Sequence, residues 1–304
     1  MHGRAAHAPP AGWGTTVVAS EREIRRRIRS VHNMSQITRA MEMVSAAKMR
    51  KAQQRVLASR PYAERLRAVI ADLSAATADP EVLQQYPLLA EREIGAAAVI
   101  LITPDRGLTG ALNTNIIRRA SRYILSEAGV PVEVIAAGKK GRDFMVRTNQ
   151  NVVAAFTGLG DTLTLEDMRG IAEVASEDFL SGKVDAVYVV YAEFVNTLTQ
   201  RPVVRRILPI ERPEEVGQYA DYIFEPSPEE VLQQLLPRYA EVQLYQAFLE
   251  SVASEHSARM VAMKNASENA KDLVAGLTLE RNKARQARIT QEVSEIAAGA
   301  NAFA

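Results

Sequence analysis

The sequence predicts an α/β domain with a mostly parallel sheet, combined with a long antiparallel coiled coil made by N- and C-terminal helices. Helical patterns occupy both ends of the chain, from about 21 to 59 and from about 228 to 302, and strands alternate with helices between them. A helix rises about 1.5 Å per residue, so the second helix alone would reach on the order of 110 Å. This exceeds what a globular domain needs, and it favours a mechanical or scaffolding role over a catalytic cleft.

The first long helix has a clear start signal at Ser20 and Glu23, which form a capping-box pair. Pro61 lacks a backbone N–H and predicts a break or kink, with a further helix following to about Ala78. Apolar residues recur at steps of three and four before that point, which predicts one buried stripe. Its members are Ile24, Ile28, Val31, Met34, Ile37, Met41 and Val44.

The middle of the chain changes its hydrophobic period. Short apolar runs at 96–103, 132–137, 152–156 and 184–191 predict buried strands, and the segments 112–127, 139–148 and 165–180 predict helices. This alternation favours right-handed crossovers and a mostly parallel sheet covered on both faces. The last strand, 200–209, alternates apolar and basic residues, as an antiparallel edge strand would.

The second long helix begins with Ser227, Pro228 and Glu230, which combine an N-cap, a proline at the first helical position and a reciprocal acid. Pro237 predicts a kink near its start. A seven-residue repeat follows, which predicts left-handed supercoiling against the first helix. The repeat comprises Val242, Leu249, His256, Met263, Ala270 and Leu277, with Tyr245, Val252, Ala266 and Leu273 at the companion position.

Two features follow from that pairing. The first helix is shorter, so the second helix extends alone past about Arg285. His256 and Arg259 lie near the seam, where polar residues fix the register of a coiled coil at some cost in stability. We therefore expect domains at 1–19 (a flexible N-terminal extension), 20–78, 79–225 and 226–304. A targeting peptide is the less favoured interpretation of residues 1–19, which contain a single Arg and no apolar core.

Composition excludes several classes of function. The chain contains no Cys, which rules out disulfides and thiolate metal sites, and its formal net charge of +1 gives no general attraction to nucleic acid. No apolar run approaches the roughly 18 residues of a transmembrane span. Any membrane association would therefore be peripheral, without direct insertion.

The segment 105–113, DRGLTGALN, follows the first strand and contains Gly107 and Gly110. A glycine-rich turn between strand and helix is a common phosphate site, but neither the GxGxxG nor the GxxxxGK[ST] pattern occurs. A tight turn with close helix packing is the favoured interpretation. No set of catalytic, cofactor-binding or metal-ligating residues stands out, so the chain is not predicted to be an enzyme.

A basic surface is expected on the first helix, and three interpretations remain open for it. An acidic protein partner is favoured, followed by a solvated face and then nucleic acid, because no aromatic residues interleave with the cations. The cations are Arg25, Arg26, Arg27, Arg29, Lys48, Arg50 and Lys51.

Four motifs carry a resemblance to a known family. The segments 24–53 (IRRRIRSVHNMSQITRAMEMVSAAKMRKAQ), 105–113 (DRGLTGALN), 258–270 (ARMVAMKNASENA) and 282–292 (NKARQARITQE) closely resemble the gamma subunit of F-type ATP synthase, in the family's order. The resemblance implies a central rotor shaft with a Rossmann-like body. The implied partners are the alpha and beta subunits of the catalytic hexamer, the epsilon subunit and the membrane c-subunit ring, at the cytoplasmic face of a bacterial plasma membrane.

The resemblance also implies partner-binding residues. Met41 is similar to the residue that faces an acidic beta-subunit loop, with Arg259 opposite it on the second helix. Arg285 and Gln286 resemble a pair that hydrogen-bonds a beta-subunit loop, with support from Thr290 and Glu292. A weaker likeness assigns Tyr222, Phe224 and Glu225 to the contact with the rotor ring. The rival hypotheses are a coiled-coil adaptor or chaperone-like protein and an α/β nucleotide-binding enzyme.

Overall fold

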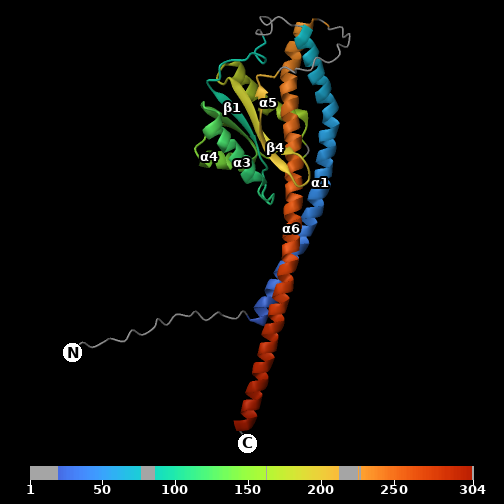
Figure 1. Cartoon of the computed structure of the whole chain (residues 1–304), viewed down its shortest axis with the longest axis vertical. Helices are drawn as coiled ribbons and strands as arrows, with labels where there is room; N and C mark the ends of the chain where they lie inside the picture. Colours follow the sequence, from blue (N-terminus) through green and yellow to red (C-terminus); the bar gives the residue numbers. More distant parts are fainter. Residues whose placement is uncertain (1–19, 77–85, 162, 212–224, 226, 303–304) are drawn as a thin grey trace, which may run out of the picture. The chain divides into compact units, whose positions relative to one another are not determined.

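The computed structural model describes residues 20–76, 86–161, 163–211, 225 and 227–302. The described residues divide into two compact units, one made of residues 20–38 with 266–302 and the other of those within 39–265. Two helices contribute to both units: α1 spans Glu21–Ala76 and α6 spans Pro228–Ala302. Figure 1 colours them blue to cyan and orange to red.

The unit of residues 39–265 contains a five-stranded sheet in the order β3-β2-β1-β4-β5. The strands are β1 (Ala97–Ile102), β2 (Val132–Ala137), β3 (Val152–Phe156), β4 (Ala186–Phe194) and β5 (Gln200–Leu208). The first four are parallel, and β5 pairs antiparallel with β4 at the edge. The predicted mostly parallel sheet with an antiparallel edge strand is thereby confirmed.

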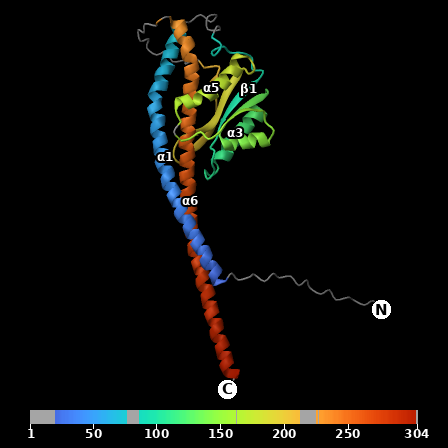
Figure 2. The same ribbon diagram turned by 180° about the vertical axis from the view of Figure 1, so that it is seen from behind.

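Helices cover both faces of this sheet (Figures 1 and 2). On one face α3 (Leu112–Arg122), a π-helical turn (Tyr123–Glu127) and α4 (Lys139–Arg147) pack on alternate residues of β1, β2 and β4. On the other face α5 (Leu165–Leu180) and the first part of α6 pack on the remaining strand residues. Strand residues alternate between the two faces, so the sheet contributes to two separate cores.

The helices begin where the polar caps predict. The hydroxyl of Ser20 accepts the Glu23 N–H at 3.3 Å, and Ser227 accepts the Glu230 N–H at 3.2 Å. Thr164 and Asp167 form a complete capping box at α5. Each cap contributes about 1 kcal/mol, so these boundaries are fixed locally by the sequence.

The prediction of a separate helix after Pro61 was wrong, because α1 continues through Pro61 to Ala76. Proline removes one N–H from the helix ladder. Leu66, Ile70 and Leu73 follow within α1 and are buried in the same apolar cluster as α6 and the sheet. Burial of each such side chain contributes about 1.5–3 kcal/mol, which outweighs the lost hydrogen bond.

In the unit of residues 20–38 with 266–302, α1 and α6 form an antiparallel pair. Ser35 contacts Ser267 at 3.4 Å, and Glu21 forms an ion pair with Arg288 at 3.0 Å. Contacts therefore run backward along α1 as they run forward along α6. The long antiparallel helices expected from the sequence are confirmed here.

The predicted composition of the seam was partly wrong. Met34, Ile37 and Val44 are exposed, at 55%, 56% and 55%, while Thr38 and Ser45 are buried. On α6, Val242, Leu249, His256, Met263 and Ala270 are buried as predicted, but Leu273 is exposed. Small side chains allow close helix approach, so Thr38 and Ser45 take buried positions in the middle of α1, while Ile24 is buried as predicted.

Two further expectations are not resolved by the fold. Residues 1–19, predicted as a flexible extension, lie outside the described residues. The domain boundaries at 78, 79, 225 and 226 also stay predictions. Within the described part of the chain, no helix combines the length and the apolar character that a membrane crossing requires.

Candidate partner-binding surface

The last turns of α6 present a continuous set of exposed side chains. Arg285, Gln286, Thr290 and Glu292 are all exposed, as the resemblance requires of residues that bind a partner. Arg288 connects this region to Glu21 at 3.0 Å and to Glu292 at 3.4 Å.

Apolar side chains are exposed on the same stretch of α6. They include Ile289, Val293 and Ile296, the last of them 72% exposed. A helix end with an uncovered apolar stripe is stabilised when a partner covers it. This surface therefore fits a protein-binding tip.

The environments of Met41 and Arg259 differ from each other. Met41 is half-buried on α1. Arg259 forms a 2.5 Å ion pair with Glu255 and donates to the backbone carbonyl of Gly107 at 3.4 Å. Its own chain therefore already supplies partners for this guanidinium, and an acidic loop would have to share it with Glu255.

α1 also exposes apolar side chains that the sequence analysis did not assign to a surface. Met43 and Val44 are exposed on α1, close in sequence to Met41. The spacing of Ser35, Thr38 and Ser45, at three and seven residues, follows the helical period as well as the apolar stripe does. This spacing is the signal that could have predicted a buried polar stripe and therefore the exposure of Met43 and Val44.

The predicted contact with the rotor ring is described only in part. Glu225 is exposed, while Tyr222 and Phe224 lie outside the described residues. The assignment of these three residues stays a prediction.

The turn after β1 is organised around Asp105. Its carboxylate accepts the Lys139 N–H at 2.6 Å and the Gly158 N–H at 2.8 Å. The first N–H group of α4 is thereby capped by an anion of the chain itself, which is a favourable position for a negative charge. Gly110 has φ +57°, which explains the glycine as a turn residue.

The cavity beside this turn is small. It has a volume of about 30 Å³ and lies between the carboxyl ends of β1 and β2 and the α6 residues Phe248, Ser251 and Val252. That space suits about one water molecule and is far below the several hundred Å³ of ordinary ligand pockets. The geometry therefore favours the tight-turn interpretation of the glycines.

A larger cavity, of about 770 Å³, lies in the same unit among α1, β4, β5 and α6. Its floor contains Tyr191, whose hydroxyl lies 3.2 Å from Glu250. Burial raises the pKa of Glu250, and the nearby guanidinium of Arg205 lowers it in part. The cavity walls carry guanidinium and carboxylate groups of both signs, so they do not select one ligand charge. No cluster of potential metal ligands occurs among the described residues.

A polar cluster forms where the loop after β3 meets both long helices. The Asp161 carboxylate lies 2.5 Å from the Lys48 ammonium and 3.2 Å from His256 Nε2. Partial burial opposes ionisation of Asp161, but the hydrogen bond from Lys48 and the neighbouring cations lower its pKa overall. Burial lowers the pKa of His256, and the charge of Asp161 opposes that effect.

Comparison with known sequences gives a consistent result. A sequence model described as ATP synthase matches residues 20–303. The ATP synthase gamma chain of Roseiflexus castenholzii is 59% identical over 289 residues, covering 94% of this chain and 99% of that protein. The corresponding chain of Chloroflexus aurantiacus is 55% identical over 288 residues, covering 93% and 99%.

Solved structures share the fold. A chain from the mitochondrial ATP synthase of Euglena gracilis aligns with a TM-score of 0.65 at 20% identity, covering 93% of this chain and 94% of that one. A chain from the central stalk and c-ring structure of the Tetrahymena thermophila enzyme aligns with a TM-score of 0.57 at 23% identity, covering 76% and 99%.

Proposed function

The chain belongs to the gamma-chain family of ATP synthase, and from this we propose that it is the central rotor shaft of that enzyme. It is a non-catalytic subunit of a membrane-associated complex. The observation that carries the proposal is the exposed end of α6, which combines Arg285 and Gln286 with an uncovered apolar stripe.

The physical mechanism needs no bond chemistry in this chain. A shaft is asymmetric, so each catalytic subunit around it meets a different face. A contact that is stronger in one conformation of a nucleotide site shifts the population toward that conformation. Rotation permutes those contacts in turn, so ion flow and ATP synthesis become coupled, and ATP hydrolysis drives rotation in reverse.

The finer partners are part of the proposal. The alpha and beta subunits would surround the end of α6, and the epsilon subunit and the c-subunit ring would contact the body. The complex would lie at the cytoplasmic face of the bacterial plasma membrane. Family membership supports this arrangement.

The rival functions account for fewer observations. A nucleotide-binding enzyme would use the turn after β1, but the cavity beside that turn has a volume of only about 30 Å³. An adaptor would explain the long helices but not the match along nearly the whole chain to gamma chains.

Reconstitution with alpha and beta subunits tests the proposal. We expect the chain to change the ATPase activity of the ring, and Arg285→Ala to weaken ring binding about tenfold or more, because a hydrogen bond to a charged group contributes about 1.5–3 kcal/mol. The melting temperature of the isolated chain should not change, since Arg285 is exposed. Lys283→Ala is the matched control on the same exposed helix. Identical ring activity with and without the chain would refute the rotor function.

Met41→Lys tests the assignment of an acidic loop to this position. An added cation should over-stabilise one rotary state, since opposite charges attract strongly where water is partly excluded. We expect fewer ions to be pumped per ATP hydrolysed in reconstituted vesicles. Met43→Lys makes the same charge change two residues away, and equal uncoupling by both variants would count against the specific placement of Met41.

A further inference from the structure

Side chains of α1 donate two hydrogen bonds to the described part of the α/β domain, and both end on Asp161. Lys48 Nζ donates to Asp161 Oδ2 at 2.5 Å, and Arg55 Nη1 donates to the Asp161 backbone oxygen at 2.6 Å. Lys48 and Arg55 lie seven residues apart, so they share one face of the helix. Asp161 therefore accepts both hydrogen bonds from the middle of α1.

The same carboxylate reaches α6. Asp161 Oδ1 lies 3.2 Å from His256 Nε2, and the imidazole is only 2% exposed. The distance suits an ion pair, yet Nε2 has no aligned hydrogen-bond partner. His256 therefore lies beside the carboxylate without forming an aligned hydrogen bond to it.

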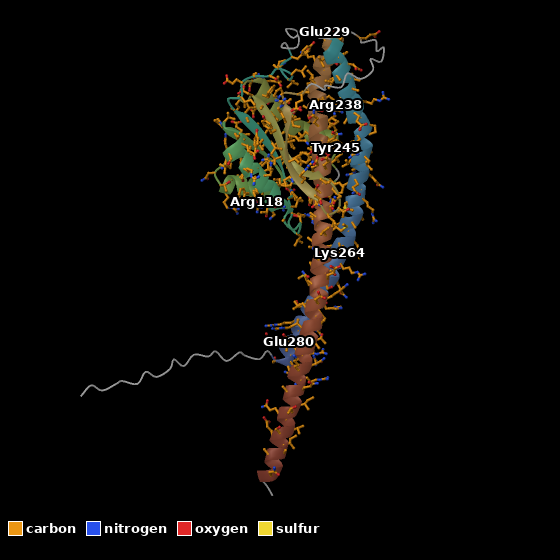
Figure 3. The ribbon with its side chains drawn as sticks, viewed as in Figure 1. Arg118, Glu229, Arg238, Tyr245, Lys264 and Glu280 are labelled. Atoms are coloured by element: carbon orange, nitrogen blue, oxygen red, sulfur yellow. The ribbon has the colours of Figure 1, made fainter. Side chains whose placement is uncertain are left out.

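The loop that carries Asp161 is fixed at its other end. Asp105 accepts the Gly158 N–H at 2.8 Å and the Lys139 N–H at 2.6 Å, which ties the loop to the carboxyl end of the sheet. Just beyond Asp161, the Tyr245 hydroxyl of α6, labelled in Figure 3, donates to the Leu163 backbone oxygen at 3.3 Å. Asp161 therefore projects from a short segment that is held on both sides.

We propose that Asp161 is a latch that holds the middle of α1 against the α/β domain, and that proton uptake by His256 loosens it by drawing the carboxylate toward α6. The contact of Asp161 with Lys48 is partly exposed, with 49% of the lysine and 40% of the aspartate side chain accessible. Exposed pairs of this kind shift an equilibrium by up to about fivefold. A contact of that strength can open and close.

The charges around His256 determine the direction of the effect. Asp161 and Glu255 attract an imidazolium, while Lys48 from α1 and Arg259 from α6 repel it. Arg259 Nη1 lies 3.5 Å from His256 Nδ1. A charged His256 would therefore compete with Lys48 for the Asp161 carboxylate and repel the lysine directly. Both effects weaken the contact of α1 with Asp161.

The latch has a consequence that rests on the proposed function. Met41 lies seven residues before Lys48 on α1, so the latch fixes the orientation of the helix segment proposed to face the catalytic ring. Asp161 and His256 would then be positioning residues for that contact.

Spin-label distances in the full chain test the latch. The native sequence has no Cys, so Arg50→Cys on α1 and Glu173→Cys on α5, both exposed, can be labelled without other changes. We expect one narrow distance distribution at about pH 7.5. Asp161→Ala should add a second, longer component, and acidification to about pH 5.5 should do the same in the native chain but not in His256→Gln.

Matched variants separate the latch from general damage. Asp161→Asn and Lys48→Met should each broaden the distance distribution, and the double variant should broaden it no further. Asp161→Glu keeps the carboxylate and should keep the narrow distribution of the native chain. Asp143→Asn is the control, since Asp143 pairs with Arg142 on the surface of α4. An unchanged distribution in Asp161→Ala, or an equal change in Asp143→Asn, would overturn the latch. A pH response that persists in His256→Gln would overturn the role of the histidine. These distances do not depend on ring binding, so the proposed function stands or falls separately.

Discussion

Alanine at Gly138 would place a Cβ atom 1.8 Å from the backbone oxygen of Thr103, where α4 begins beside β1. Gly138 also has φ +120°, a conformation that side chains other than glycine rarely adopt. Its N–H donates to the Phe156 backbone oxygen at 2.8 Å, so the residue is held in place by the sheet. The added methyl group therefore meets backbone that cannot move away without loss of hydrogen bonds.

The expected magnitude follows from two contributions. The backbone conformation costs about 1–3 kcal/mol in an alanine residue. Relief of the overlap would stretch the bonds from Thr103 N to Ala137 O and from Gly141 N to Thr103 Oγ1, each contributing about 1 kcal/mol. Gly138→Ala should therefore destabilise the chain by about 3–5 kcal/mol, a fall in melting temperature of roughly 10 °C.

Two other glycines separate strain from overlap. Gly158 has φ +78° and open space around its Cβ position, so Gly158→Ala should cost about 1–2 kcal/mol. Gly107 has open space and no positive φ, so Gly107→Ala should be nearly neutral. Thermal unfolding of the isolated variants, followed by far-ultraviolet circular dichroism, measures the series. If Gly138→Ala melts at the temperature of Gly158→Ala, the argument from close packing at α4 is refuted.

Three further predictions concern charged groups, each measured by chemical unfolding of the isolated chain. Burial raises the pKa of Glu250, so the fold disfavours its charged form, and Glu250→Gln should stabilise the chain at neutral pH. Burial lowers the pKa of His256, so the unfolded chain binds a proton more readily than the folded chain, and the stability of the fold decreases as the pH falls below the unfolded value of about 6.5. His256→Gln should remove that decrease. Asp105→Ala should cost about 1–2 kcal/mol, because the Lys139 and Gly158 N–H groups lose their acceptor, and should create no nucleotide binding.

Exposed counterparts provide the controls for these changes. Glu166→Gln on α5, His32→Gln on α1 and Asp143→Ala on α4 change the same side chains at exposed positions. Destabilisation by Glu250→Gln at neutral pH would contradict the account of that carboxyl group. A similar acid response in His32→Gln and His256→Gln would contradict the role of burial, and tight nucleotide binding by Asp105→Ala would reopen the enzyme hypothesis.

Local signals in the sequence account for most of the element boundaries. Ser227 with Pro228 starts α6, and Thr164 with Asp167 starts α5, because a cap satisfies backbone groups within a few residues of itself. The alternation in 200–209 likewise predicted the edge strand β5, which spans Gln200–Leu208. Pro61 was misinterpreted because the packing that keeps α1 helical involves the sheet and α6, which are distant in sequence.

Among the candidate site residues, the exposed group on the last turns of α6 followed from the resemblance, while the surroundings of the others did not. Arg259 is paired with Glu255 and Gly107, and the second of these lies in a loop far away in sequence. Asp161 drew no attention because a single aspartate in a polar loop carries no periodic or motif signal.

The sequence by itself determined the two long helices, the order of strands and helices and the family, since hydrophobic period, caps and motifs are local properties of the chain. Only the tertiary structure decided which stripe of α1 faces α6. Small polar residues allow two helices to approach closely, and an apolar stripe can equally be buried against another protein. The buried surroundings of His256 were decided in the same way, because charge and burial there depend on α1, α6 and the loop after β3 meeting in space.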